Sequence, residues 1–554
     1  MHKRLIIMAS LALAFSISHA QATTWAVDFS NAIIKRWPTN IESMTAKTKW
    51  EYSNGIILHG IEKVYDHTKN SDYLSYIQKW VDSYVSTSGV VNIDTSLHSL
   101  DQIQPAVLCL FLYKETGTAK YKTAADYILS YLAKQPKNAS GGFWHKETYP
   151  NQMWTDGIYM AEPFVSKYGF RIGSAGYCDS IATFQPALLY SHAYNSTSKL
   201  LVHAWDETKK AAWADATNGL SPCVWSRGMG WYFVGMVDVL KYLPKTNPQY
   251  NAMLTMLANI AEGIKNAQDP TTGLWYEVTD KPSLTGNFLE SSGSGLFIYA
   301  LKTAVDYGFI DKSYLAVAQK GWTGFKTQLT LDAQGLPVIN GFVGAMSAGL
   351  LANYISPAVS PVSCPTNTAP HGYCASLFAA SAMELQTVPK YRLTINVVGQ
   401  GSVSNPMGEM FLDSGSTLTL TATPNSGYHC QWSGDASGSS VTASIAMNAE
   451  KNVTATFTQG SSILDSRAIK AYGGASINLT RSGATITFAV ASPKKIAVEI
   501  YNCNGCKIVG YSGGVFQPGN RFIDLKMQGI TAGTYFIKIV HDGIINTSMM
   551  TLFE

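Results

Sequence analysis

Apolar residues recur at helical spacing from about residue 25 to residue 386. In the stretch YLSYIQKWVDSYV, the side chains of Tyr73, Ile77, Trp80 and Tyr84 fall on one face of a helix. The same spacing is found in TAADYILSYLAK, GWYFVGMVDVLKYL, YNAMLTMLANIAEGI and SGLFIYALKTAVDYGF. No convincing series of strands lies between these stretches, which argues against a βαβ barrel. The pattern therefore predicts an all-α domain.

The loops between these helices resemble one another. A glycine precedes apolar residues in SGVVNID, SGGFWHKE, NGLSPCVW, TGLWYEV and QGLPVIN, which recur every fifty to eighty residues. This weak internal repeat has the size of a helical hairpin with its loop. Six or seven such hairpins closed into a ring would form an α/α barrel. Its loops would gather at one end and line a pocket.

A different pattern begins near Pro389. YRLTINVVGQGSVS, STLTLTATPNSGYHCQWSG and KNVTATFTQG alternate apolar and polar residues and end in turns, as half-buried strands do. We expect a small β-domain over residues 388–459. Residues 460–554 show further short strands without helices, which predicts a β-sandwich. The predicted fold is thus an all-α barrel at 21–387 followed by two small all-β domains.

The composition is that of a folded protein. Of 554 residues, 46% are hydrophobic, 12% are aromatic and 14% are charged, which excludes a disordered chain. The net charge of +4 gives no case for binding nucleic acid or an anionic membrane. Thirty Tyr and thirteen Trp residues suit a protein that lays aromatic faces against a polar ligand.

Residues 1–20 have the pattern of an export signal. A basic start, MHKR, precedes an apolar run too short to span a bilayer and then SHA before Gln21. We expect a secreted or cell-surface protein without a membrane span in the mature chain. Export permits disulfides, and Cys364 and Cys374, which bracket a Pro-rich loop, are the expected pair. CNGC at 503–506 lacks a second Cys or His pair nearby, so it does not indicate zinc.

Asp156 stands among apolar residues in NQMWTDGIYMAEPF, and the next Lys or Arg is Lys167. A buried carboxylate must be paired or become neutral. If Asp156 faces the pocket, burial and a second carboxylate would raise its pKa, so that it could hold a proton as a general acid. Asp101, in LDQIQP, is the candidate for that second carboxylate. The alternative for both residues is helix capping.

Four other polar residues lie in aromatic, glycine-punctuated settings. They are His145 in GGFWHKE, His203 in LVHAWDE, Arg227 in WSRGMGW and His371 in PHGYC. A lone His on an apolar face usually belongs to the core, and Arg227 could stack between two Trp rings. Taken singly, this structural interpretation is favoured for His145 and His371.

Longer motifs carry a resemblance to a known family. GGFWHKETYPNQMWTDGIYMAEPF and LVHAWDETKKAAWADATNGLSPCVWSRGMGWYFVGMVDVL resemble the catalytic region of family 105 glycoside hydrolases, the unsaturated rhamnogalacturonyl hydrolases. GLWYEV, NFLESSGSGLFIYAL and PHGYCASLFAASAMEL extend the resemblance over nearly all of 40–386. The related family 88 shares the barrel and the acid, but WSRGMGW after HAWDE points to family 105.

The resemblance implies an (α/α)6 barrel in which Asp156 is the general acid/base and Asp101 is its acidic partner. It also implies a sugar site lined by His203, Arg227, Trp225, Trp231, His145, Tyr52 and His371. The implied substrate is a pectic oligosaccharide that ends in a 4,5-unsaturated galacturonate. The implied reaction adds a proton and then water across the C4=C5 bond, and it needs no cofactor and no metal.

Two other functions stay open. An enzyme for unsaturated glucuronyl ends, from ulvan or arabinogalactan, would share every residue named above. A non-catalytic surface protein that binds pectic chains is the second alternative. The retention of Asp101, Asp156, His203 and Arg227 argues against it.

The two C-terminal segments carry resemblances of their own. GSVSNPMGEMFLDSGSTLTLTATPNSGYHCQWSG resembles the divergent internalin B-repeat. The tail, with VEIYNCNGCKIVGY and GTYFIKIV, resembles the sorting domains of type IX secretion. That resemblance implies a partner in the type IX secretion machinery and a Gram-negative source.

Overall fold

The computed structural model describes residues 24–356, 361–364, 370–385, 390–404, 408–459, 476–480, 483–526 and 533–552. The expected export signal at residues 1–20 lies outside them. The chain forms two compact units, a helical one that begins the chain and a β-rich one that holds most of residues 394–554. None of the described helices is long and apolar enough to cross a membrane.

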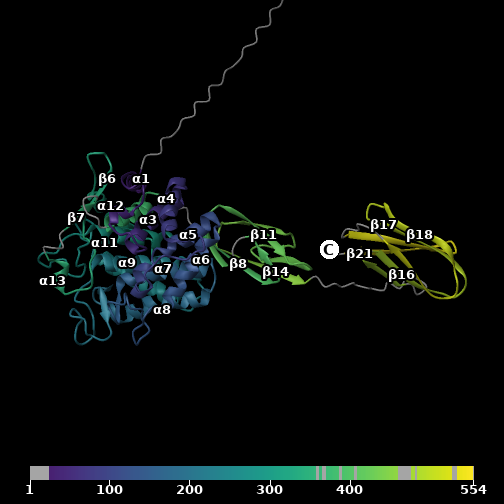
Figure 1. Ribbon diagram of the computed structural model, residues 1–554, viewed down its shortest axis with the longest axis horizontal. Coiled ribbons are helices and arrows are strands. Elements are labelled where there is room, and N and C mark those ends of the chain that lie inside the picture. The colour runs from purple at the N-terminus through teal and green to yellow at the C-terminus, as the bar shows by residue number, and fades with distance from the viewer. Residues whose placement is uncertain are drawn as a thin grey trace, which may run out of the picture. The chain divides into compact units, whose positions relative to one another are not determined.

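Six helices of the described chain form a closed inner ring, and Figure 1 labels α3, α5, α7, α9 and α11 among them. They are α3 (Tyr52–Thr68), α5 (Ala106–Thr116), α7 (Thr155–Arg171), α9 (Ser226–Leu240), α11 (Ser291–Asp306) and α14 (His371–Glu384). Each packs against the next, and α14 packs against α3. Helices α7 and α9 are buried on all sides, as helices in the wall of such a ring must be.

Six outer helices each pack on one inner helix. They are α1 (Trp25–Arg36), α4 (Ser71–Tyr84), α6 (Ala119–Leu132), α8 (Ala175–Ala193), α10 (Tyr250–Asn266) and α12 (Tyr314–Lys326). Helix α4 buries Tyr73, Ile77 and Trp80 on one side, as its periodicity predicts. The expected (α/α)6 barrel is therefore confirmed. Because each outer helix returns the chain, all six inner helices begin at the same end of the barrel.

The connecting loops contain short elements that the sequence pattern did not predict. The short helices are α2 (Glu42–Thr45), η1 (Thr95–Leu97), η2 (Leu100–Gln102) and α13 (Leu351–Tyr354). The short strands are β1 (Gln152–Trp154), β2 (Tyr194–Asn195), β3 (Leu200–Leu201), β4 (Ala204–Asp206), β5 (Leu329–Leu331), β6 (Pro337–Phe342) and β7 (Val362–Cys364). Strand β1 pairs antiparallel with β4, with Trp154 opposite Ala204. This pairing matters for the site described below.

The expected disulfide between Cys364 and Cys374 does not form, and no disulfide occurs among the described residues. Cys374 lies in the first turn of α14, where the charges of Lys63 and Arg227 in the barrel interior act on its thiol. Cys364 ends β7, where the charge of Arg36 acts on its thiol. The two thiols therefore face different surroundings, although the sequence places them only a loop apart.

Residues 390–459 form two small antiparallel sheets, ordered β10-β8-β14-β12 and β13-β11-β9. Their strands are β8 (Lys390–Gly399), β9 (Gly401–Val403), β10 (Gly408–Asp413), β11 (Thr417–Pro424), β12 (Tyr428–Gly434), β13 (Thr442–Ala446) and β14 (Lys451–Gln459). Trp432 is buried among them and belongs to the core of this domain.

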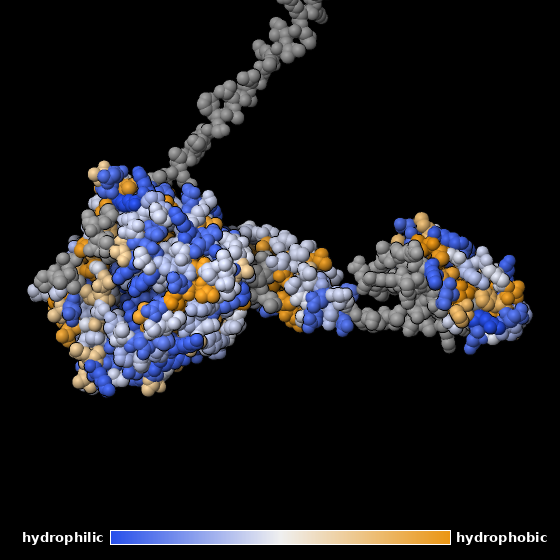
Figure 2. Space-filling view, viewed as in Figure 1, coloured by the Kyte–Doolittle hydropathy of each residue, from blue (hydrophilic) through white to orange (hydrophobic). Residues whose placement is uncertain are grey.

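The last strands form two further sheets, ordered β15-β16-β19 and β18-β17-β20-β21. They are β15 (Ser476–Thr480), β16 (Gly483–Val490), β17 (Lys494–Asn502), β18 (Lys507–Phe516), β19 (Gly519–Lys526), β20 (Gly533–His541) and β21 (Ile544–Leu552). Ile486, Val498 and Ile537 are buried in one core, as in the predicted sandwich. Phe522 and Met549 are exposed, and orange areas mark this part of the chain in Figure 2.

Candidate active site

The predicted site residues gather where the inner helices begin. Tyr52 opens α3, Asp156 and Arg227 lie in the first turns of α7 and α9, and His371 opens α14. Asp101 lies on η2, just before α5. A cavity of about 140 Å³ is lined by Tyr52, Asp101, His145, Lys146, Trp154, Asp156, Met160, Trp225, Arg227, Trp231, Ala345, Met346, Ser347 and His371. Every predicted site residue except His203 lines it.

Asp156 is positioned by a strand that turns directly into a helix. Strand β1 ends at Trp154, and the backbone N–H of Thr155 donates to the carbonyl of His203, 2.9 Å away. Residue 228 of α9 is a glycine, because a Cβ there would lie 2.7 Å from Thr155 Oγ1 and 3.2 Å from Asp156 Oδ2. The helix-capping alternative for Asp156 is wrong, since the N-cap position is Trp154.

A chain of hydrogen bonds runs inward from Asp156. Its Oδ2 lies 3.0 Å from Nε2 of His203, whose Nδ1 lies 2.7 Å from the hydroxyl of Tyr354. The His203 side chain is 0% exposed. The prediction that His203 contacts the sugar therefore needs correction: it lies behind Asp156 and orients that carboxylate.

The expectation of a raised pKa for Asp156 is wrong. Burial acts to raise it, but the hydrogen bond to His203 and the charge of that ring outweigh burial, so the pKa lies below its ordinary value. Asp156 is consequently ionised at neutral pH before substrate binds. The sequence could not reveal this, because His203 reaches Asp156 only through the pairing of β1 with β4.

Asp101 is paired and does not act on Asp156 as a second bare carboxylate. Its Oδ2 lies 2.5 Å from Lys146 Nζ, and its Oδ1 lies 3.5 Å from His145 Nε2. Its local turn is capped by Ser99, so Asp101 is not the cap. Burial lowers the pKa of His145 to about 4, so this imidazole is neutral. The His145 ring stacks on Trp154 with centroids 4.5 Å apart.

Arg227 holds a loop. Its Nη1 donates to Ser292 Oγ at 2.9 Å and to the Val343 carbonyl at 2.8 Å, and its Nη2 donates to the Gly344 carbonyl. The guanidinium lies 4.6 Å from the ring centroid of Trp225. Nη1 is thus fully engaged, whereas the buried Nε of Arg227 has no hydrogen-bond partner among the described residues. Arg227 lines the cavity while it fixes the loop that contributes Ala345, Met346 and Ser347.

The two predicted tryptophans present little ring face to the cavity. Trp225 carries Arg227 on its ring and lies 4.6 Å from the ring of His203. Trp231 stacks on Tyr159 with centroids 4.4 Å apart. Both tryptophans are at most 2% exposed. They shape the wall of the cavity by packing.

Tyr52 and His371 close another side of the cavity, with the Tyr52 hydroxyl 3.2 Å from His371 Nε2. Burial raises the pKa of Tyr52 and holds the pKa of His371 well below its usual range. Both side chains are therefore neutral hydrogen-bonding groups. Residues 365–369 of the Pro-rich loop between Cys364 and Cys374 lie outside the described residues.

Sequence reasoning missed several residues around the site. Lys146 directly follows His145 in GGFWHKE, so its position could have drawn attention. Tyr354 lies 151 positions from His203 and gave no signal. Two buried carboxyls, Glu277 and Glu290, each lie 3.2 Å from Ser226 Oγ behind the cavity wall.

This arrangement can carry out proton chemistry. The carboxylate of Asp156 faces the cavity, and His203 behind it can share a proton. The ammonium group of Lys146, which is paired with Asp101, also lines the cavity. No group of three or more His, Cys, Asp or Glu side chains in the described part of the chain is arranged to hold a metal ion.

Comparisons with known proteins agree with this geometry. Residues 25–386 match the family model Glycosyl Hydrolase Family 88, and residues 391–461 match the Divergent InlB B-repeat domain. A solved glycoside hydrolase of family 105 from C. acetobutylicum is similar, with 30% identity and a TM-score of 0.61 over 66% of this chain and 100% of that one.

Two named enzymes are also similar in sequence. Unsaturated rhamnogalacturonyl hydrolase YesR of Bacillus subtilis is 26% identical over 281 residues, which is 48% of this chain and 75% of that protein. An unsaturated 3S-rhamnoglycuronyl hydrolase of Formosa agariphila is 26% identical over 174 residues, which is 30% of this chain and 45% of that protein. The chain therefore belongs to Glycosyl Hydrolase Family 88, and together with its likeness to family 105 this makes it an unsaturated uronyl hydrolase.

Proposed function

We propose that this hydrolase releases 4,5-unsaturated galacturonate from the non-reducing end of rhamnogalacturonan oligosaccharides made by lyases. The observation that carries the mechanism is the hydrogen-bonded series Asp156–His203–Tyr354, which opens onto a buried cavity. The similarity to an unsaturated rhamnogalacturonyl hydrolase supports this choice of sugar.

The C4=C5 bond of the substrate is an enol ether conjugated to a carboxylate. Asp156 delivers a proton to C4, which leaves an oxocarbenium centre at C5. Water adds at C5 and returns a proton to the Asp156 carboxylate. The resulting hemiketal opens to a ketone at C5 and expels the neighbouring sugar from C1. The glycosidic bond is never attacked directly, so one acid/base group suffices.

An Asp156 that is ionised at rest must gain its proton when substrate binds. The substrate brings a second carboxylate into a buried cavity, and a nearby like charge raises the pKa of a carboxyl group. His203 Nε2 lies 3.0 Å from Asp156 and is the group placed to supply or share that proton. Lys146, whose side chain is 30% exposed, is the cation placed to meet the incoming uronate.

The test is the Asp156→Asn variant, assayed by the loss of ultraviolet absorbance from the conjugated double bond. We expect kcat to fall by a factor on the order of 10³, since general acid catalysis contributes roughly 10²–10⁴-fold. Asp179→Asn is the matched control, because Asp179 is buried on α8 away from the cavity and should retain activity. Normal turnover by Asp156→Asn would remove this residue from the mechanism.

The same assay distinguishes the sugars. Turnover of unsaturated galacturonyl-rhamnose with little turnover of unsaturated glucuronyl-rhamnose is the expected result. The reverse preference would favour the glucuronyl alternative, which the similarity to an unsaturated 3S-rhamnoglycuronyl hydrolase keeps open.

We also propose export to the cell surface or medium of a Gram-negative bacterium. The basic, apolar and small-residue pattern of residues 1–20 and the sorting-like strands of the tail support this. Mass spectrometry of the secreted protein should find an N-terminus at Gln21, and retention of residues 1–20 on a cytoplasmic protein would contradict the proposal.

A further inference from the structure

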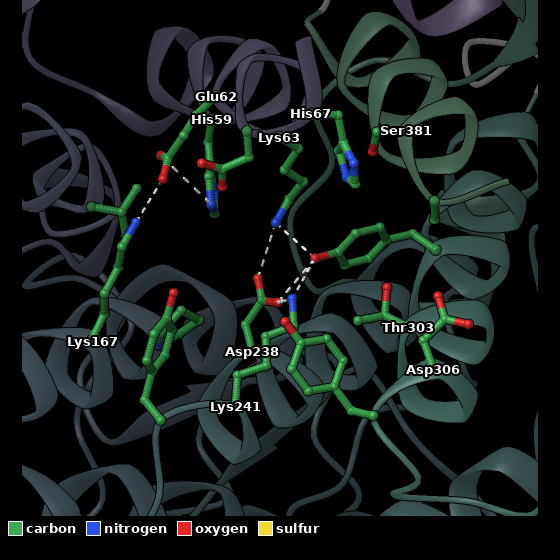
Figure 3. Close-up of a pocket in the computed structure, with 17 residues that line it drawn as sticks. His59, Glu62, Lys63, His67, Lys167, Asp238, Lys241, Thr303, Asp306 and Ser381 are labelled. Atoms are coloured by element: carbon green, nitrogen blue, oxygen red, sulfur yellow. Dashed lines mark hydrogen bonds and ion pairs between the residues drawn. The ribbon is translucent and has the colours of Figure 1, made fainter. Parts of the chain in front are cut away.

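A second cavity lies at the other end of the barrel, among the C-terminal halves of the inner helices (Figure 3). Its volume is about 190 Å³. That is space for about six water molecules at roughly 30 Å³ each. Helices α3, α7, α9, α11 and α14 all contribute to its wall, and none of its residues belongs to the site above.

Two ammonium groups share one carboxylate at the centre of this cavity. Asp238 lies 2.7 Å from Lys241 Nζ and 3.4 Å from Lys63 Nζ. Both lysines also donate to the hydroxyl of Tyr299, at 2.9 and 2.7 Å. Burial would lower the pKa of each lysine, but Asp238 raises it above the ordinary value, so both are charged. Figure 3 shows the two lysines pointing at Asp238 from different helices.

The neighbouring groups on α3 and α7 do not cancel the extra positive charge. Lys167 and Glu62 form a neutral pair at 2.7 Å. Burial and nearby lysines hold the pKa of His59 well below its usual range, so this ring is uncharged.

The two remaining carboxylates of the wall have cations of their own. Asp66 pairs with Lys69 and Lys114, and Asp306 pairs with Lys302. One positive charge is therefore left over where Lys63 and Lys241 meet.

Helix dipoles explain part of this arrangement. The C-terminal ends of helices carry partial negative charge and favour lysines. Lys241 is the C-cap residue of α9, so its positive charge offsets the partial negative charge at the end of this helix. The dipoles do not explain why two ammonium groups, on side chains that are each 13% exposed, converge beside open volume. A largely buried excess charge of this kind is stabilised by a counter-ion.

The wall also offers groups suited to hydroxyls. Thr303 and Ser381 line the cavity from α11 and α14. Glu62 Oε2 is buried and has no hydrogen-bond partner among the described residues, while its other oxygen holds Lys167. Buried oxygens of this kind are normally satisfied, so an unfilled acceptor points to a donor from a ligand.

We propose that this cavity binds a small hydroxylated carboxylate of the size of one uronic acid. Its carboxylate lies between Lys63 and Lys241, and its hydroxyl groups meet Thr303, Ser381 and Glu62. The site is separate from the active site and does not depend on the proposed function.

The experiment is isothermal titration of the full chain with D-galacturonate, a saturated acid that cannot be hydrated. We expect a binding event that Lys63→Met weakens at least tenfold. Lys63→Met leaves Asp238 paired with Lys241, so the variant should fold. Thr303→Val keeps every charge and should weaken the same event several-fold. Lys146→Met should leave it unchanged, because Lys146 belongs to the active site.

Neutral D-galactose should not bind in this way. The proposal is overturned if galacturonate does not bind, or if neither Lys63→Met nor Thr303→Val weakens the binding. It is also overturned if only Lys146→Met abolishes the binding, which would assign it to the active site. Binding of inorganic phosphate without binding of galacturonate would overturn the assignment to a hydroxylated carboxylate.

Discussion

Replacing Glu277 with Gln should make the folded protein more resistant to rising pH. Glu277 is fully buried, accepts from Trp225 Nε1 at 2.8 Å and lies 3.2 Å from Ser226 Oγ. The same Ser226 oxygen lies 3.2 Å from Glu290. Burial and the negative charge of Glu290 raise the pKa of Glu277 to about 8.

The sign and size of the effect follow from that pKa. A carboxyl whose pKa is raised by folding contributes stability that is complete below its unfolded value, here 4.5, and is lost as the pH rises towards 8. Each pKa unit corresponds to 1.36 kcal/mol, so the wild-type protein loses roughly 5 kcal/mol across this window. Gln cannot ionise, and its amide can donate to Ser226 as a protonated Glu277 would. The advantage of Glu277→Gln should therefore grow by about 1.4 kcal/mol for each pH unit between 5 and 8.

The assay is the free energy of unfolding by urea, measured for both proteins from pH 5 to pH 8.5. Groups that titrate alike in the two proteins cancel in the difference. Glu290→Gln is the matched control, because Glu290 caps α11 by accepting from Ser292 N and Gly293 N. It should destabilise the protein at every pH. A difference between Glu277→Gln and wild type that stays constant from pH 5 to pH 8 would refute the reasoning.

Three further predictions concern the site and the thiols. Tyr354→Phe removes the hydroxyl that is hydrogen-bonded to His203. Because such a hydrogen bond is worth about 1 kcal/mol, kcat should fall about fivefold with KM unchanged. Steady-state rates that show only a change in KM would contradict this. Lys146→Met leaves the cavity more negative, so KM for unsaturated disaccharide should rise at least tenfold, and an unaltered KM would exclude Lys146 from uronate binding. Thiol titration of the denatured chain without reductant should count eight thiols. A count of six would contradict this, and peptide mapping would show whether the disulfide joins Cys364 to Cys374.

The ring of helices could be predicted because its cause is local. Inner and outer helices each need an apolar face to pack in the barrel. Apolar residues therefore recur at the helical period in each helical stretch of the sequence. The starts of the inner helices also carry chemically unusual residues, so Asp156 and Arg227 could be singled out from the sequence, whereas Tyr52 followed only from the family resemblance. The hairpin repeat then predicts that these residues lie at the same end of the barrel.

The state of each side chain could not be predicted, because it depends on partners distant in the sequence. Asp156 is ionised because β1 pairs with β4 and brings up His203, 47 positions away. Arg227 has the expected place, but its bonds to the carbonyls of Val343 and Gly344 could not be foreseen, since these lie more than a hundred positions further on. The hydrophobic periodicity shows which face of a helix is buried. It gives no information on which polar side chains contact one another.

The parallel course of the inner helices links the two ends of the barrel. Six helix N-termini converge on the active site, and partial positive charge at such ends stabilises anions. This contributes to an ionised Asp156 and also favours a substrate that carries a carboxylate. The negative ends of the same helices converge on the lysines around Asp238. The ionised state of Asp156 before substrate binds is therefore a consequence of the fold. The negative charge of the bound uronate can raise the pKa of Asp156 and so return its proton. On this reasoning the carboxylate of the substrate takes part in catalysis as well as in recognition.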